Sequence, residues 1–301
     1  MERIITIIDY HQRTNNNQIL FNKHASAELP RCKYPWQEII VNQQGITYNC
    51  ASPAWLPKSI GSILDYDNIF DLLNSYEARA LRSEIDLGRY SYCNNNICMH
   101  LNIPEHKQLY SNRPQTNEDL TLLTEEQFTE SSIVTQLPTD ICFDFDYTCN
   151  FKCPSCRTDI INYNQGPMSE ITQQLVPKIK TMILDEYADH PVHIRWAGGE
   201  PFVSQAYLEL WEYIISLGNT KIKNTIQTNG SYLKKRDKLF EKFLPYIHAL
   251  RISFDAGTSD TYSKVRVNGD WSTLIENCQY VKEVISKSGF KIQLQSDFVI
   301  Q

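Results

Sequence analysis

Three cysteines stand close together near the middle of this 301-residue chain, in the run Cys149-Asn150-Phe151-Lys152-Cys153-Pro154-Ser155-Cys156. Three thiolates on one loop can bind three irons of a cubane [4Fe–4S] cluster, whereas a cluster held wholly by protein takes four. The fourth iron is then open to a ligand from outside the protein. Zinc is the alternative, but zinc sites usually close with a fourth Cys or His, and none follows nearby. We therefore expect an iron–sulfur cluster with one open iron.

Four further cysteines lie in the first third of the chain, at Cys32, Cys50, Cys93 and Cys98. Four thiolates close a cluster without an open site, and they suit zinc equally well. Thiols of a cytosolic protein stay reduced, so clustered cysteines indicate metal binding or catalysis rather than disulfides. Cys142 and Cys278 stand alone, and we expect both to be packing residues because a lone thiol behaves as a small apolar side chain.

Charge and hydropathy exclude several kinds of partner. The formal net charge is -6 and no run of Lys and Arg stands out, so no nucleic-acid partner is expected. The apolar run at the N-terminus closes at Asp9, which is too short for a signal peptide. No stretch approaches the roughly 18 apolar residues of a membrane span. These features predict a cytoplasmic protein without a membrane partner.

Strand-like and helix-like segments alternate from residue 138 onward. Regular alternation of this kind predicts an α/β fold with parallel strands and crossover helices. The expected strands are Ile141–Tyr147, His193–Trp196, Asn224–Thr228, Ala249–Phe254 and Phe290–Ile300. The expected helices are Ser169–Tyr187, with a kink or restart at Pro177, Gln205–Leu217, Leu233–Leu244 and Leu274–Lys287.

Each of these strands has one polar and one apolar face, because side chains two residues apart point the same way. A closed eight-stranded barrel fills its interior with apolar side chains instead. The pattern therefore predicts a partly open βα barrel whose polar face lines a cavity. An antiparallel sheet with one face in water is the alternative, but the intervening helices require crossovers. The residues expected to contact a polar substrate are Asp144, Asp146, Arg195 and Gln295, and pairing of the charged groups among them with each other is the alternative.

The first part of the chain reads differently, with short strands at Glu38–Asn42 and Gly45–Asn49 and a helix at Ile69–Glu84. We expect a small Cys-rich α+β module over residues 1–110. A polar, proline-punctuated linker over 111–137 follows, with a short helix at Glu125–Glu130, and the barrel occupies 138–301.

Three more motifs follow the strands in order. Gly198-Gly199-Glu200-Pro201 comes after the second strand, Thr228-Asn229-Gly230 closes the third, and Ser253-Phe254-Asp255 closes the fourth. Together with the CxxxCxxC run after the first strand, this order resembles the radical S-adenosylmethionine (radical SAM) superfamily over about residues 138–301. Barrels of that family usually have six βα units, and five strands are visible here. We therefore expect a sixth strand beyond Gln301, or a partner chain or the N-terminal module along the edge of the fifth strand.

The resemblance implies how the cofactors are held. The amino and carboxylate groups of SAM would bind the open iron, and the Gly198–Pro201 segment would hold the amino group, with Glu200 as acceptor. Ser253 and Asp255 would contact the ribose, and Arg266 the carboxylate. Asn229 is counted among the cofactor contacts. Many members carry an aromatic residue where this chain has Ser155, which leaves the adenine contact undefined.

The resemblance also implies the reaction. A reductant such as flavodoxin or ferredoxin would supply one electron, SAM would be cleaved to a 5′-deoxyadenosyl radical, and the radical would take hydrogen from a substrate. The expected enzyme is an oxidoreductase or a peptide-modifying enzyme, acting on a peptide or small polar substrate, with a peptide or protein preferred.

The spacing of Cys32, Gly45 and Cys50 resembles the start of SPASM and twitch modules, which hold an auxiliary [4Fe–4S] cluster. Cys93 and Cys98 would supply its last two thiolates. In most relatives this module follows the barrel, whereas here it comes first, and zinc remains open for the same four residues.

Three other functions stay open. The first is a small-molecule radical SAM dehydrogenase. The second is a non-enzymatic iron–sulfur or zinc scaffold, which predicts no SAM binding. The third is a metal-dependent hydrolase on a βα barrel, for which His193 with Asp144 and Asp146 are the available ligands.

Overall fold

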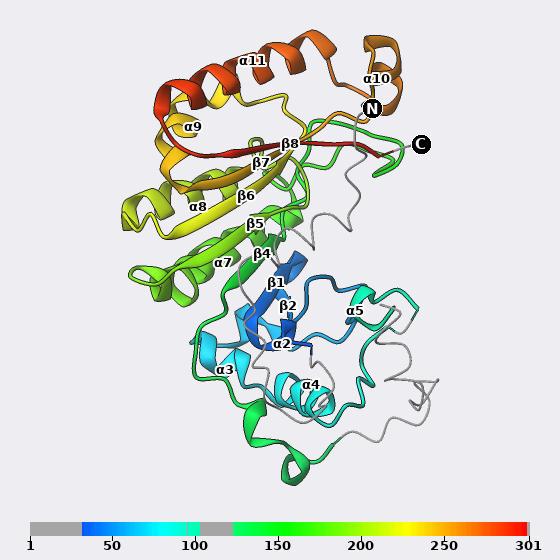
Figure 1. Ribbon diagram of the computed structural model, residues 1–301, viewed down its shortest axis with the longest axis vertical. Helices are drawn as coiled ribbons and strands as arrows, with labels where there is room; N and C mark the ends of the chain where they lie inside the picture. Colours follow the sequence, from blue (N-terminus) through cyan, green and yellow to red (C-terminus); the bar gives the residue numbers. More distant parts are fainter. Residues whose placement is uncertain (1–31, 95, 103–122, 300–301) are drawn as a thin grey trace, which may run out of the picture. The chain divides into compact units, whose positions relative to one another are not determined.

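The computed structural model describes residues 32–94, 96–102 and 123–299. The described residues all belong to one compact unit, which is shown in Figure 1. The N-terminal run that closes at Asp9 and the first part of the predicted linker lie outside the described residues. Across the described part of the chain, no helix is both long and apolar enough to cross a membrane.

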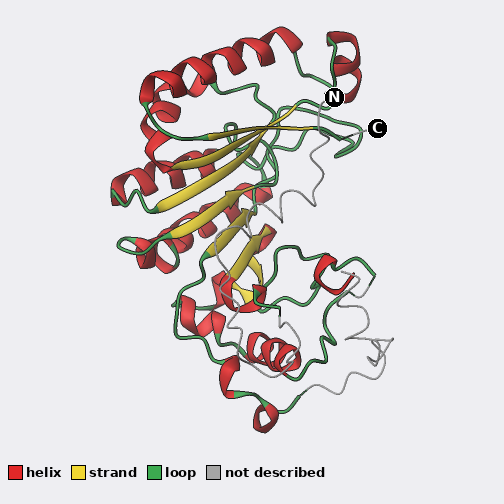
Figure 2. Ribbon diagram, in the orientation of Figure 1, coloured by secondary structure: helices red, strands yellow, loops and turns green. Residues whose placement is uncertain are grey.

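One eight-stranded sheet, ordered β3-β2-β1-β4-β5-β6-β7-β8, organises this unit (Figures 1 and 2). Six neighbouring strands run parallel, and the two at one edge are antiparallel to their neighbours. The parallel strands are β1 (Glu38–Asn42), β4 (Asp140–Asp144), β5 (Val192–Trp196), β6 (Ile222–Thr228), β7 (Ile247–Ser253) and β8 (Gln293–Asp297). The antiparallel pair is β2 (Ile46–Tyr48) and β3 (Gly61–Ser62). The predicted partial βα barrel of parallel strands is confirmed.

The sixth parallel strand comes from the N-terminal part of the chain. β1 pairs with β4 in register, with Glu38 opposite Asp140 and Asn42 opposite Asp144. Among the described residues β8 pairs with β7 alone, so the N-terminal module does not lie along the edge of β8, and a strand beyond Gln301 or a partner chain at that edge stays a prediction. The sheet also runs across the predicted boundary between module and barrel, because the module supplies three of its strands.

Helices cover the apolar face of the sheet, as Figure 2 shows. In β5, Val192, Ile194 and Trp196 are buried on this face, while His193 and Arg195 are only partly covered. The ring of Trp196 lies 5.8 Å from that of Trp211 in the next helix. The covering helices are α7 (Pro167–Met182), α8 (Gln205–Leu217), α9 (Asp237–Phe243) and α11 (Trp271–Ser288), and α10 (Ser259–Val265) precedes α11. The two-sided strand pattern therefore marks a real division between a packed face and a polar face.

Several element boundaries differ from the sequence prediction. The helix expected over Ile69–Glu84 is two helices, α3 (Ile69–Leu73) and α4 (Tyr76–Asp86), because Ser75 caps α4 by accepting a hydrogen bond from the Ala78 amide. Pro177 lies inside α7 without ending it. The remaining helices are α2 (Tyr34–Gln37) and α5 (Met99–Asn102), with 3-10 turns at Gln43–Gly45, Ile63–Asp65, Glu125–Gln127, Glu130–Ser132, Leu184–Tyr187, Lys234–Arg236 and Leu244–Tyr246.

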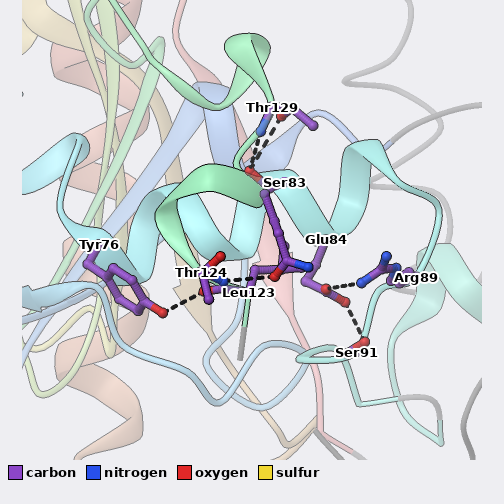
Figure 3. Close-up of polar contacts among 9 residues, drawn as sticks. Tyr76, Ser83, Glu84, Arg89, Ser91, Leu123, Thr124 and Thr129 are labelled. Carbon is purple, nitrogen blue, oxygen red and sulfur yellow. Dashed lines mark hydrogen bonds and ion pairs between the residues drawn. The ribbon is translucent and has the colours of Figure 1, made fainter. Parts of the chain in front are cut away.

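The second half of the predicted linker packs on α4, as Figure 3 shows. The Tyr76 hydroxyl donates to the Leu123 carbonyl (2.6 Å), and the Thr129 amide donates to the Ser83 hydroxyl (3.0 Å). The guanidinium of Arg82 is fully buried and donates to the Ser132 carbonyl (2.6 Å). Residues 123–132 are thus part of the folded N-terminal region and not a free connection.

Candidate metal and cofactor site

The three central cysteines occupy a loop that begins directly after β4. The Cys149 amide donates to the Ile161 carbonyl (2.9 Å), and the Lys152 amide donates to the Val267 carbonyl (3.0 Å). The Cys156 amide donates to the Cys153 carbonyl (2.9 Å), which makes a tight turn between the last two cysteines. Backbone hydrogen bonds therefore hold the loop at the carboxyl end of the sheet.

An N–H donor lies near each of the three sulfurs. Asn229 Nδ2 is 3.9 Å from Cys149 Sγ, Arg266 Nη1 is 3.7 Å from Cys153 Sγ, and Arg157 Nη2 is 3.5 Å from Cys156 Sγ. Hydrogen bonds from such donors stabilise thiolates, and hydrogen bonds to sulfur tune iron–sulfur clusters. Burial raises the pKa of Cys149 to about 11, so a metal must displace its proton. The donor set fits a cluster held by three thiolates.

No three His, Cys, Asp or Glu side chains converge on a single metal position in the described residues. The ligands required by the hydrolase alternative are spread out. His193 is bonded to Asp140 Oδ1 (3.2 Å) through Nδ1 and to Thr225 Oγ1 (2.8 Å) through Nε2. Both ring nitrogens of His193 are therefore engaged by neighbouring strands rather than by Asp144 or Asp146.

The turn after β5 requires its two glycines. Gly198 has a φ of 98°, and a Cβ there would lie 2.6 Å from the Asp146 carbonyl oxygen. A Cβ on Gly199 would lie 2.0 Å from the Thr148 carbonyl oxygen. Only glycine allows two backbones to approach so closely. The Gly198–Pro201 turn is thereby pressed against the chain that leads into the cysteine loop.

Glu200 connects this turn to the turn after β6. Its side chain is fully buried, and Oε1 accepts hydrogen bonds from Thr228 Oγ1 (2.7 Å) and the Phe202 amide (3.1 Å). Oε2 accepts one from the Asn229 amide (2.6 Å). Burial raises the pKa of Glu200 to about 7. The contact between Glu200 and the SAM ammonium stays a prediction. The hydrogen bonds of Glu200 also connect the turn after β5 to the turn after β6.

Asp255 and Arg266 form an ion pair with 2.6 Å between Oδ2 and Nη2. Asp255 has a φ of 55°, and its Oδ1 accepts a hydrogen bond from the Val299 amide (2.9 Å). Arg266 Nε is buried and has no hydrogen-bond partner in the described part of the chain. A carboxylate ligand would supply the missing acceptor. Ser253, at the end of β7, accepts a hydrogen bond from Gln227 Nε2 (2.9 Å).

Residues 145–292 match the model of the Radical SAM superfamily. The chain contains a radical SAM domain. The domain begins one residue after β4 and ends just before β8, and its cofactors are a [4Fe–4S] cluster and SAM. The sheet that carries the radical SAM domain is wider than the match, because β1, β2, β3, β4 and β8 lie outside it.

Two solved structures of SuiB from Streptococcus suis resemble the chain. SuiB bound to its precursor peptide SuiA is 20% identical, with a TM-score of 0.37 over 55% of this chain and 34% of that chain. SuiB bound to S-adenosylmethionine is 18% identical, with a TM-score of 0.38 over 60% of this chain and 42% of that chain. The chain thus spans less than half of either SuiB chain.

The four residues predicted to meet substrate have different surroundings. β4 ends at Asp144, so the alternation does not continue to Asp146, which is buried behind the loop. Asp146 accepts hydrogen bonds from the Thr148 amide (2.8 Å) and Ser204 Oγ (2.5 Å). Arg195 is ion-paired with Glu38, and Gln295 donates to Gln293 Oε1 (3.3 Å) on the edge strand. Asp144 keeps a position on the polar face.

The four N-terminal cysteines gather around a second, smaller apolar cluster. Cys50 and Cys98 are buried in it, and Cys32 and Cys93 pack against it. Mutual charge repulsion with Cys98 adds to burial in raising the pKa of Cys32 and Cys50, both to about 12. The four positions, spread over 67 residues of sequence, thus contact one apolar cluster, but among the described residues no three of them converge as metal ligands, and one shared site stays a prediction.

Several residues that support these sites were not foreseen. The Cys32 amide donates to the Tyr90 hydroxyl (3.1 Å), and the Asn94 amide beside Cys93 donates to the Trp55 carbonyl (2.7 Å). Buried Glu84 accepts hydrogen bonds from Ser91 Oγ (2.5 Å) and Arg89 Nη1 (3.2 Å) (Figure 3). In the barrel, Arg157 was missed as a donor to sulfur, although a cation directly after the third cysteine was a signal for it.

Proposed function

We propose that the chain acts as a radical SAM enzyme that cleaves SAM reductively and abstracts hydrogen from a polar substrate. The observation that supports this most strongly is the set of three cysteine sulfurs, each beside an N–H donor, at the carboxyl ends of the parallel strands. When bound and reduced, a [4Fe–4S] cluster with SAM supplies a 5′-deoxyadenosyl radical that removes hydrogen atoms from carbon. The remaining work of the protein is to hold and orient the reactants.

This chain's residues divide that work. Cys149, Cys153 and Cys156 would hold three irons. The backbone at Gly198 and Gly199 would approach the methionine end of SAM, and Arg266 would bind its carboxylate through the buried Nε that has no acceptor in the described residues. The other proposed SAM contacts are Glu200, Pro201, Asn229, Ser253 and Asp255.

The N-terminal cysteines would hold an auxiliary cluster. Support comes from one apolar cluster, to which α4 contributes side chains and which all four cysteines contact: Cys32, Cys50, Cys93 and Cys98. Four thiolates leave no open iron, so such a cluster would exchange electrons rather than bind SAM. Zinc is the other occupant that this set would accept.

The substrate we favour is a peptide or protein, and dehydrogenation of a small molecule is the second candidate. Both need a polar face beside the radical SAM site, which Asp144, Gln227 and Arg251 provide. A cytoplasmic location and a flavodoxin or ferredoxin as electron donor belong to the same proposal.

Anaerobic reconstitution with iron, sulfide, SAM and dithionite tests the proposed function, with 5′-deoxyadenosine as the measured product. We expect product formation by the wild type and none by the variant with Cys149, Cys153 and Cys156 all changed to Ala. SAM binding without 5′-deoxyadenosine, in a sample whose iron content is complete, would contradict the enzymatic function. Absence of SAM binding would favour the scaffold alternative.

A further inference from the structure

Two hydrogen-bond acceptors lie next to each other on the polar face, at the carboxyl end of the sheet. Asn42 ends β1 and Asp144 ends β4, and the two residues are opposite each other in the parallel register. Asn42 Oδ1 is buried and accepts no hydrogen bond from the part of the chain that the structure describes. Among the described residues the Asp144 carboxylate has one hydrogen-bond partner, the Tyr147 hydroxyl at 3.4 Å from Oδ2. Buried acceptors that lack donors are costly, so this pair suits a ligand that donates hydrogen bonds.

Asp144 is also unlike the other carboxylates of the polar face. Each of the others has a basic partner: Asp140 pairs with His193 and Asp297 with Arg251 on the adjacent strand, and Glu38 of β1 pairs with Arg195 of β5, two strands away. Among the residues that the structure describes, Asp144 makes no ion pair. Burial raises the pKa of Asp144 to about 6, so the carboxylate is nevertheless ionised at neutral pH. A partly buried negative charge without a counter-charge attracts a cation.

The surroundings place this charge beside the radical SAM site. A Cβ on Gly198 would lie 3.1 Å from Asp144 Oδ1, so the carboxylate lies against the glycine turn. The ring of Tyr147 stacks on that of Tyr163 at 6.3 Å, and the Tyr163 hydroxyl accepts a hydrogen bond from Gln43 Nε2 (2.9 Å). Aromatic rings next to a carboxylate add to the attraction for a cation.

We propose that Asp144 and Asn42 bind a cationic group of the substrate, an ammonium or a guanidinium, next to the Gly198–Gly199 turn. The carboxylate supplies the charge and the Asn42 carbonyl oxygen accepts one further N–H. On a peptide, the group is a Lys or Arg side chain. This inference rests on the proposed function and assigns a substrate class to the same site.

The test uses the reconstituted holoprotein with SAM, immobilised under anaerobic conditions. Four pools of synthetic octapeptides have random flanks and a fixed central Lys, Arg, norleucine or Glu. We expect the Lys or Arg pool to be retained about tenfold more than the norleucine pool, as one charged hydrogen bond allows. Asp144→Asn should remove this preference, and Asp144→Lys should shift it toward the Glu pool. Asp67→Asn, which removes a fully exposed carboxylate, should leave it intact.

Equal retention of the Lys, Arg and norleucine pools by the wild type would overturn the inference. So would a loss of SAM affinity in Asp144→Asn, measured by equilibrium dialysis, because the cation would then be the ammonium of SAM itself. Formation of 5′-deoxyadenosine is measured in the same samples. If it persists while the peptide preference is absent, the cation site fails and the proposed function stands. If it is absent, the proposed function fails.

Discussion

The two cysteine regions of the chain are built in opposite ways. The barrel cysteines lie within eight consecutive residues, and one loop closed by backbone hydrogen bonds presents all three. The N-terminal cysteines are spread over 67 residues and meet only because an apolar cluster and the α4 network bring distant segments together. The first site therefore depends on local geometry, and the second depends on the packing of its whole region.

The largest expected effect comes from removing the local site. The triple change of Cys149, Cys153 and Cys156 to Ala should lower the iron content of the reconstituted protein from about eight to about four per chain. The remaining iron would show that the N-terminal site forms independently. Iron analysis with parallel zinc analysis checks this, and a wild-type protein with four irons and one zinc would remove the auxiliary cluster.

Glu200→Ala should be the most destabilising single change in the barrel. It leaves the Asn229 amide and the Thr228 hydroxyl without their buried acceptor, and each loss costs about 1–3 kcal/mol. Chemical denaturation should show that Glu200→Ala lowers the free energy of unfolding by about 3 kcal/mol in total. Glu200→Gln should lower it less. A fully stable Glu200→Ala protein that has only lost SAM affinity would assign the residue to the cofactor alone.

Glu84→Ala should impair the N-terminal cysteine region and leave the barrel cysteine region intact. Loss of the buried acceptor for Ser91 and Arg89 loosens the segment that leads to Cys93, at a cost of about 2 kcal/mol. Auxiliary iron should fall while 5′-deoxyadenosine formation from SAM alone persists. Glu77→Ala is the matched control, because Glu77 lies on the same helix and its side chain makes no hydrogen bond or ion pair with the described residues. Equal loss of iron from both sites would mean that the regions are not independent.

Asp144→Asn should raise stability, in contrast to the other changes. The pKa of this carboxyl is raised by burial to about 6 in the folded protein, above its unfolded value, so ionisation opposes folding. The wild type loses stability as pH rises from about 4 to 6, by about 2 kcal/mol once partial exposure is considered. The variant should therefore be more stable at pH 8 and equal at pH 4. Denaturation curves of both proteins at pH 4 and pH 8 test this. If the stability difference between variant and wild type is the same at both pH values, a partner neutralises the Asp144 charge.

Arg266→Ala is expected to have the smallest effect on iron content, while it weakens SAM binding and leaves the buried Asp255 carboxylate without its ion-pair partner. SAM affinity should fall about tenfold because one charged hydrogen bond is lost. Iron content should stay the same, since Arg266 is not itself proposed as an iron ligand and contacts Cys153 Sγ only as a hydrogen-bond donor. Arg266→Lys is the conservative control, and it should recover the charge but not the Nε geometry. Unchanged affinity in both variants, measured by anaerobic dialysis, would remove Arg266 from the SAM site.

Local patterns in the sequence were sufficient to predict the parallel strands, the cysteine loop and the turns that follow β5 and β6. Each of these depends on residues near one another in the chain. The pairing of β1 with β4 could not be predicted, because a strand of five residues carries no mark of a partner about 100 residues away. The alternation rule also failed to separate Asp144 from Asp146, since nothing local shows that β4 ends between them. Similarly, Asp is a residue type that adopts positive φ more often than most, but nothing local to Asp255 predicts its positive φ or its ion pair with Arg266.

The parallel pairing of β1 with β4 has a consequence for how the protein folds as it is made. β1 leaves the ribosome about 100 residues before β4, which at usual synthesis rates is a delay of roughly 5 to 20 seconds. Long-range parallel pairing is also slow to form once both strands exist, because a long loop must close first. During this interval β1, with its buried residues Ile39, Ile40 and Val41, has no neighbour on its β4 side. The nascent chain should accordingly be most dependent on chaperones before residue 144 emerges.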